Sequence, residues 1–243
     1  RRTAPQTYRG MAGLLVIEGD EDEALGLPSG RFELPLILRD RRAESDDPFD
    51  HAARAMGPDV MMGYLGDTPY ANGAPRPTID VARGAYRLRL LNASNARLLE
   101  LELDSGDAMT LVGTDGGLLP AAARVERILM GTGERADLLV DFSRFEAGSR
   151  VVLRSRAFEI PGMMGMGMMG GGPPAGRGPG GMGRGRGGRG GMGGLPQGTA
   201  MDFVTFRVTD ERAAPMPSLP ARLREPRGAR PESLGAPHVG RLP

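Results

Sequence analysis

Cysteine is absent from this 243-residue chain, and histidine occurs only as His51 and His238. Disulfides, thiolate catalysis and zinc sites of the cysteine–histidine type are therefore excluded. A blue-copper centre needs two imidazoles and a thiolate, so this chain cannot build one by itself. His51 stands in an acidic stretch and is interpreted as a solvated side chain, with a metal site there as the less favoured alternative. His238 receives no role.

Lysine is also missing, because all 31 basic residues are arginine, which we attribute to base bias in the coding sequence. Thirty acidic residues balance them, and a net charge of +1 gives no reason to expect nucleic acid or a membrane surface as a partner. No apolar run reaches the roughly 18 residues of a membrane span. No signal peptide is visible, but the chain begins at Arg1 rather than Met, so we expect a fragment or a processed product.

Alternating apolar residues separated by turn-forming residues dominate positions 86–142. Residues 92–95 and 115–117 are rich in Asn, Asp and Gly, which tolerate turn geometry. Several short strands at this spacing predict an antiparallel sandwich or barrel. Five leucines alternate with polar or charged neighbours, as half-buried strands require: Leu88, Leu90, Leu99, Leu101 and Leu103.

Local signals refine this picture. Pro35 predicts that its strand lies at a sheet edge or that Pro35 is among its first residues, and Asn72-Gly73 signals a hairpin turn. Glu134 and Arg135 are interpreted as a structural pair at a strand start. Residues 115–117 are read as a turn because a phosphate cradle would need a following helix and a lysine. Further strands are expected at residues 11–17, 32–38, 61–65, 78–81, 136–142, 151–156 and 201–208.

Residues 162–194 consist almost entirely of Gly, Met, Arg and Pro. This composition cannot bury enough apolar surface to offset its ordering entropy, so we predict a disordered insertion between two strands. Its Arg-Gly portion, residues 183–190, is a weak RNA-binding candidate because it has no interleaved aromatic residue. Its methionines are the candidate metal site, since thioethers prefer Cu(I), although they could instead serve as apolar filler: Met163, Met164, Met166, Met168 and Met169.

Blocks spread over residues 3–210 resemble, in family order, the middle cupredoxin-like domain of three-domain multicopper oxidases of the bacterial laccase, spore-coat and cuprous-oxidase group. Each block alone has an explanation in β-architecture, so their order and spacing carry the resemblance. The blocks are TYRGMAGLLVIEGD, ELPLILRDR, YLGDTPYANGAPRP, YRLRLLNASNARLLEL, GTDGGLLP, LMGTGERADLLVDFS and MDFVTFRV.

The resemblance implies an all-β fold, a cupredoxin-like Greek-key β-sandwich or barrel carrying the disordered Gly/Met/Arg-rich insertion. Residues 28–212 would form the middle domain, with residues 162–194 as the insertion. Residues 1–27 would be the last strand or strands of a truncated first domain. Residues 213–243 would be a linker toward a missing third domain.

In function, the resemblance implies a fragment of a secreted or periplasmic multicopper oxidase. Its parent would oxidise phenols or metal ions by single electrons and reduce oxygen to water. Copper would be held by the first and third domains, which are the expected partners together with the small-molecule or metal-ion reductant, and this chain alone should be inactive. Met-rich segments recruit Cu(I) in related cuprous oxidases. The alternatives are a non-catalytic copper-chaperone β-sandwich and the structural product of a degenerate or frame-shifted gene.

Overall fold

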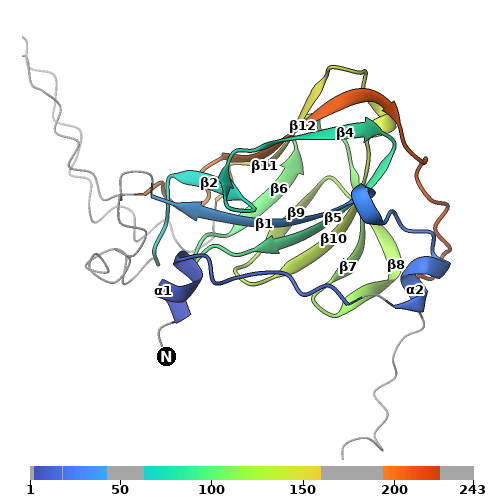
Figure 1. Cartoon of the computed structure of the whole chain (residues 1–243). Helices are drawn as coiled ribbons and strands as arrows, with labels where there is room; N and C mark the ends of the chain where they lie inside the picture. The colour runs from blue at the N-terminus through green and yellow to red at the C-terminus, as the bar shows by residue number, and fades with distance from the viewer. Residues whose placement is uncertain (1–2, 18, 43–62, 160–193, 225–243) are drawn as a thin grey trace, which may run out of the picture.

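The computed structural model describes residues 3–17, 19–42, 63–159 and 194–224, which form two facing β-sheets with short helical segments at the periphery (Figure 1). The helical segments are α1 (Thr3–Tyr8), α2 (Asp20–Ala24) and the 3-10 turns η1 (Gly30–Phe32) and η3 (Phe142–Arg144). One sheet has seven strands in the order β3 (Ala74–Pro75), β2 (Thr68–Ala71), β1 (Glu33–Arg41), β5 (Ala85–Asn92), β10 (Arg135–Asp141), β7 (Met109–Thr114) and β8 (Gly117–Val125). The other has five in the order β4 (Thr78–Arg83), β12 (Met201–Arg212), β11 (Arg150–Ser155), β6 (Leu99–Leu103) and β9 (Arg127–Met130).

The predicted all-β, cupredoxin-like sandwich is confirmed, but the sheets are mixed rather than purely antiparallel. The exceptions are β1 with β5 and β4 with β12, which pair in parallel. Parallel neighbours need a long connection between them. Here β2 to β4 lie between β1 and β5 in sequence, and β5 to β11 lie between β4 and β12.

The core lies between the sheets and follows the predicted alternation. All five leucines are at most 1% exposed: Leu88, Leu90, Leu99, Leu101 and Leu103. In β6 they alternate with half-buried glutamates, so this strand buries one face. In β5, Arg87 on the opposite face is also buried, because further chain covers the outer side of the seven-stranded sheet.

The segment between β11 and β12 joins two neighbouring strands. Ser155 pairs with Met201 in the antiparallel β11–β12 ladder, and Phe158 N–H donates to the carbonyl of Gly198 at 3.0 Å. The low-complexity insertion therefore lies between two strands of one sheet, as the sequence predicts. Residues 160–193 themselves lie outside the described residues, so their predicted disorder stays a prediction.

Asn72 explains how a proline fits inside β1. The β1–β2 register begins at Leu38, so the β2 side of β1 has no paired strand at Pro35. There the Asn72 side chain donates to Pro35 O and accepts from Ile37 N, both at 2.8 Å. Asn72 and Gly73 have φ values of 49° and 84°, which confirms the predicted hairpin turn between β2 and β3. Pro35 thus stands at a local edge within an internal strand.

Two expected strands are not formed. Residues 11–17 follow α1 as an extended segment and pair with no described strand. Residues 63–65, the described part of the strand expected at 61–65, have no strand partner, and β2 begins only at Thr68. Arginine side chains bind two carbonyls here instead: Arg42 Nε donates to Leu65 O at 2.9 Å, and Arg97 Nη2 donates to Gly66 O at 2.7 Å.

Candidate functional site

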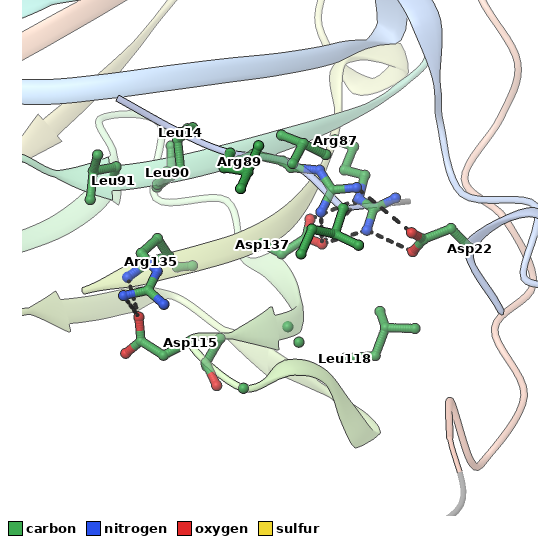
Figure 2. Close-up of a pocket in the computed structure, with 18 of the residues that line it drawn as sticks. Leu14, Asp22, Arg87, Arg89, Leu90, Leu91, Asp115, Leu118, Arg135 and Asp137 are labelled. Carbon is green, nitrogen blue, oxygen red and sulfur yellow. Dashed lines mark hydrogen bonds and ion pairs between the residues drawn. The ribbon is translucent and has the colours of Figure 1, made fainter. Parts of the chain in front are cut away.

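A groove of about 920 Å³ lies on the outer face of the seven-stranded sheet. Residues 12–17 and Gly19 form one wall, β5 and β10 form the floor, and the turn between β7 and β8 forms the other wall (Figure 2). Two leucines, Leu14 of the extended segment and Leu118 of β8, line this space from opposite walls. The groove is therefore bounded on one side by chain that belongs to no sheet.

The wall formed by residues 11–17 is apolar and open to solvent. Met11, Leu15 and Ile17 are 73%, 87% and 81% exposed. Among the described residues, no backbone hydrogen bond joins positions 12–17 to another part of the main chain. Extended backbone in this state is a ready template for pairing with a further strand.

Two arginines and three carboxylates form a largely buried network at one end of the groove. Figure 2 shows all of its members except Glu33. Arg87, 3% exposed at its side chain, contacts Asp137 at 2.6 Å and Asp22 at 2.9 Å. Arg89 binds Glu33 and lies 3.5 Å from Asp137. Asp22 belongs to α2, so the network fastens the segment before the sheet onto β5 and β10.

The charge state of the network follows from these contacts. Burial lowers the pKa of Arg87, but hydrogen bonds from Arg87 to Asp137 and Asp22, together with the charges of these carboxylates, outweigh burial and raise it. Arg87 is thus a fixed cation, and its partners satisfy it within the protein. The network therefore stabilises the contact between α2, β5 and β10, and it offers no free acid or base for catalysis.

Two features expected from the sequence, the turn at residues 115–117 and the residues Glu134 and Arg135, lie beside the groove. The Asp115–Gly117 stretch is the predicted turn, because Thr114 pairs with Gly117 in the β7–β8 hairpin. Glu134 accepts from Gly131 N at 2.6 Å, whereas Arg135 pairs with Asp115 at 2.9 Å. Both residues therefore have structural roles at the start of β10, as the sequence analysis expects, and each holds a turn with a partner of its own.

The candidate metal ligands lie outside the described residues. This applies to His51, to His238 and to the five methionines Met163, Met164, Met166, Met168 and Met169. Within the described ranges, no group of three or more His, Cys, Asp or Glu side chains is placed to hold a metal ion. The described part of the chain therefore does not fit a blue-copper or three-copper centre.

No helix in the described ranges has the length and apolar character to cross a membrane.

The groove and its ion network were not foreseen from the sequence. Arg87 and Arg89 alternate with buried leucines in β5, which was a readable sign of a second buried face. Their partner Asp22 is 65 residues away from Arg87. Nothing in the local pattern of Asp22 links it to that strand.

No family model matches this chain. Cell division protein FtsP from Xenorhabdus nematophila is 42% identical over 147 residues, which are 60% of this chain and 30% of that protein. FtsP from Sodalis glossinidius gives the same identity and coverage. The chain thus spans about a third of the length of the curated relatives that it matches.

Solved structures give a broader match. A variant of the McoA multicopper oxidase from Aquifex aeolicus superposes with a TM-score of 0.67 at 30% identity, covering 92% of this chain and 42% of that one. A laccase from Pediococcus acidilactici superposes with a TM-score of 0.60 at 27% identity, covering 85% of this chain and 34% of that one. Both matches extend over most of this chain and under half of the longer proteins.

Proposed function

Since this chain has the multicopper-oxidase fold that its sequence blocks predicted, we propose that it serves as the copper-free middle domain of a longer multicopper-oxidase-like protein. In this role it holds two copper-bearing neighbours, a first and a third cupredoxin domain, at a fixed separation. It also contributes one wall of the entrance for the reducing substrate. The chain by itself performs no oxidation.

The observation that carries this proposal is the unpaired segment at residues 11–17. Exposed apolar side chains and an unpaired backbone are expected of a strand whose partner strands belong to another domain. Strands of a preceding domain would satisfy that backbone and cover Leu15 and Ile17. On this interpretation, residues 1–27 are the last part of a first domain, as the sequence predicted, and residues 28–212 are the middle domain.

The copper of the catalytic centres enters this proposal only through the neighbouring domains. The 243 residues include no cysteine and only two histidines, so they cannot supply the ligands of the family's centres. When bound in the neighbouring domains, copper would take single electrons from phenols or metal ions and pass them to oxygen, forming water. The parent protein would work in the periplasm or after secretion, without nucleic acid as a partner.

The methionines of the insertion are proposed to capture Cu(I) for the parent enzyme. Their thioethers are neutral and soft, and they stay unprotonated at biological pH. Cu(I) should be titrated into this chain against a competing chelator, alongside a variant in which the site is changed to serine. A control changes Met182 and Met192 instead. Equal binding by all three proteins would refute capture by the cluster, which comprises Met163, Met164, Met166, Met168 and Met169.

A second function is favoured by the curated relatives. The FtsP proteins are 42% identical over their matched residues and are named for cell division, whereas the oxidase structures above are 27–30% identical. A copper-free structural protein would need the same scaffold and the same docking segment. A stand-alone copper chaperone is the remaining alternative, and it would need the methionine site without the neighbours.

Metal analysis of the full-length natural protein separates these functions. The oxidase proposal expects bound copper together with oxygen consumption when a phenol or Cu(I) is supplied. Protein that is free of copper after reconstitution, with no oxygen consumption, would overturn the oxidase role and favour the structural one. Copper bound without any oxygen consumption would favour the chaperone.

A further inference from the structure

A second apolar cluster lies outside the sandwich core, on the outer face of the seven-stranded sheet. Its floor comes from three adjacent strands: Val112 of β7, Leu118 of β8 and Leu139 of β10, which are 0%, 9% and 1% exposed. The neighbours of Leu139 in β10, Leu138 and Val140, point into the main core instead. Outer-face residues become this buried only when other chain covers them.

Two segments from opposite ends of the chain provide that cover. Leu27, just after α2, and Leu223, beyond β12, are both in the cluster and are 7% and 5% exposed. Leu25 of the first segment and Met216 and Leu219 of the second also pack against the cluster. Figure 1 shows α2 and the chain after β12 meeting at the same end of the molecule, next to β8.

Polar contacts fix the two segments independently of this packing. Asp22 of α2 binds Arg87 at 2.9 Å, which holds the first segment on β5. Leu223 N–H donates to Pro120 O at 2.8 Å, which holds the second segment on β8. The apolar cluster is therefore the place where two separately anchored segments share buried surface.

We propose that this cluster is a joint that couples the segment preceding the sheet to the segment following β12, so that displacement of either one loosens the other. The joint consists of Leu27 and Leu223 packed on Val112, Leu118 and Leu139. It deepens the proposed scaffold function, because these segments are the ones that would lead to the two neighbouring domains. Through it, a movement of one neighbour would change how firmly the other is held.

Amide hydrogen exchange on this chain tests the coupling without copper or neighbours. Leu27→Ala should accelerate exchange of the Leu223 amide about tenfold or more, and Leu223→Ala should do the same for the amides of Gly26 and Leu27. Amides in the β5–β10 ladder should keep their protection. Leu27→Val retains part of the packing and should give an intermediate acceleration, which keeps the test informative if the alanine variant unfolds.

Leu15→Ala is the matched control, because it changes a leucine of the same preceding segment that is 87% exposed and outside the cluster. It should leave the Leu223 amide unchanged. Faster exchange only in the segment that carries the mutation would overturn the joint. That outcome would leave the scaffold proposal standing, because the scaffold proposal is decided by the copper content and oxygen consumption of the full-length protein.

Discussion

Arg97 and Asp40 form an ion pair in which each side chain is 1% exposed, with Arg97 Nε 2.7 Å from Asp40 Oδ2. The other Arg97 N–H groups donate to the carbonyls of Gly66, Leu195 and Pro196 at 2.7, 2.7 and 2.9 Å. One guanidinium thus fastens β1 to residues 66 and 195–196. Each of the three guanidinium nitrogens therefore has an acceptor, which is the condition for burying an arginine.

Removing the Asp40 carboxylate should destabilise the folded protein, because the Arg97 charge is buried. Asp40→Asn is expected to lower the free energy of unfolding by about 3–5 kcal/mol, because the Arg97 charge stays buried without its counter-ion. Urea denaturation measures the change. Asp80→Asn is the control, since it breaks the solvent-exposed pair with Arg207 and should cost far less. Equal losses in the two variants would show that the burial of the Arg97 pair is immaterial.

Asn72 should contribute through its side-chain amide as well as its backbone conformation. Asn72→Gly retains the left-handed φ but leaves Pro35 O and Ile37 N without their side-chain partner. A loss of about 1–3 kcal/mol in unfolding free energy is expected from chemical denaturation. Asn72→Asp keeps the acceptor for Ile37 N but places a carboxylate oxygen against Pro35 O, so it should also destabilise the protein. A fully stable glycine variant would contradict the bridging role.

Gly198 and Gly106 share a φ of 77° but differ in their surroundings. A Cβ at Gly198 would lie 2.1 Å from Phe158 O, whereas one at Gly106 would meet nothing within 4 Å. Gly106→Ala should cost about 1 kcal/mol from backbone strain alone. Gly198→Ala should cost a further 1–3 kcal/mol or so, because the carbonyl of Phe158 must move. Thermal unfolding of both variants gives the comparison, and similar melting temperatures would refute it.

The exposed Asp80–Arg207 pair should be visible in an acid titration. The hydrogen bond from Arg207 is the main cause that lowers the pKa of Asp80. A carboxyl whose pKa is lower when folded adds stability above its unfolded pKa, and this stability is lost as the pH falls through the folded value. NMR titration of Asp80, near and below the usual aspartate pKa of about 3.9, should show the shift. Arg207→Gln should return the pKa of Asp80 toward its ordinary value, and so should high salt.

Much of the fold was readable from local patterns. Alternating leucines predicted β5 and β6, the Asn72-Gly73 pair predicted its hairpin, and Asp115 to Gly117 predicted the turn between β7 and β8. These features depend on residues close together in sequence, where periodicity and turn chemistry act directly.

The long-range features could not be read in the same way. Arg97 and Asp40 are 57 residues apart, and each has an ordinary local context. Residues 11–17 have the apolar composition of a strand, but a strand forms only where a partner supplies the ladder. The joint could not be predicted either, because it also depends on contacts between distant residues. In the sequence, Leu27 and Leu223 are isolated apolar residues in irregular chain, and only the fold brings them to the same face of the sheet.

The contact between Phe158 and Gly198 has a practical consequence for engineering. β11 and β12 are paired neighbours, and the bond between Phe158 and Gly198 extends this pairing past the ends of both strands. The sheet therefore does not depend on the length of the segment that connects Phe158 to Gly198. A short artificial turn grafted between these two residues should preserve the sandwich. The grafted protein would be a compact host into which other metal-binding or labelled sequences could be spliced at a defined place.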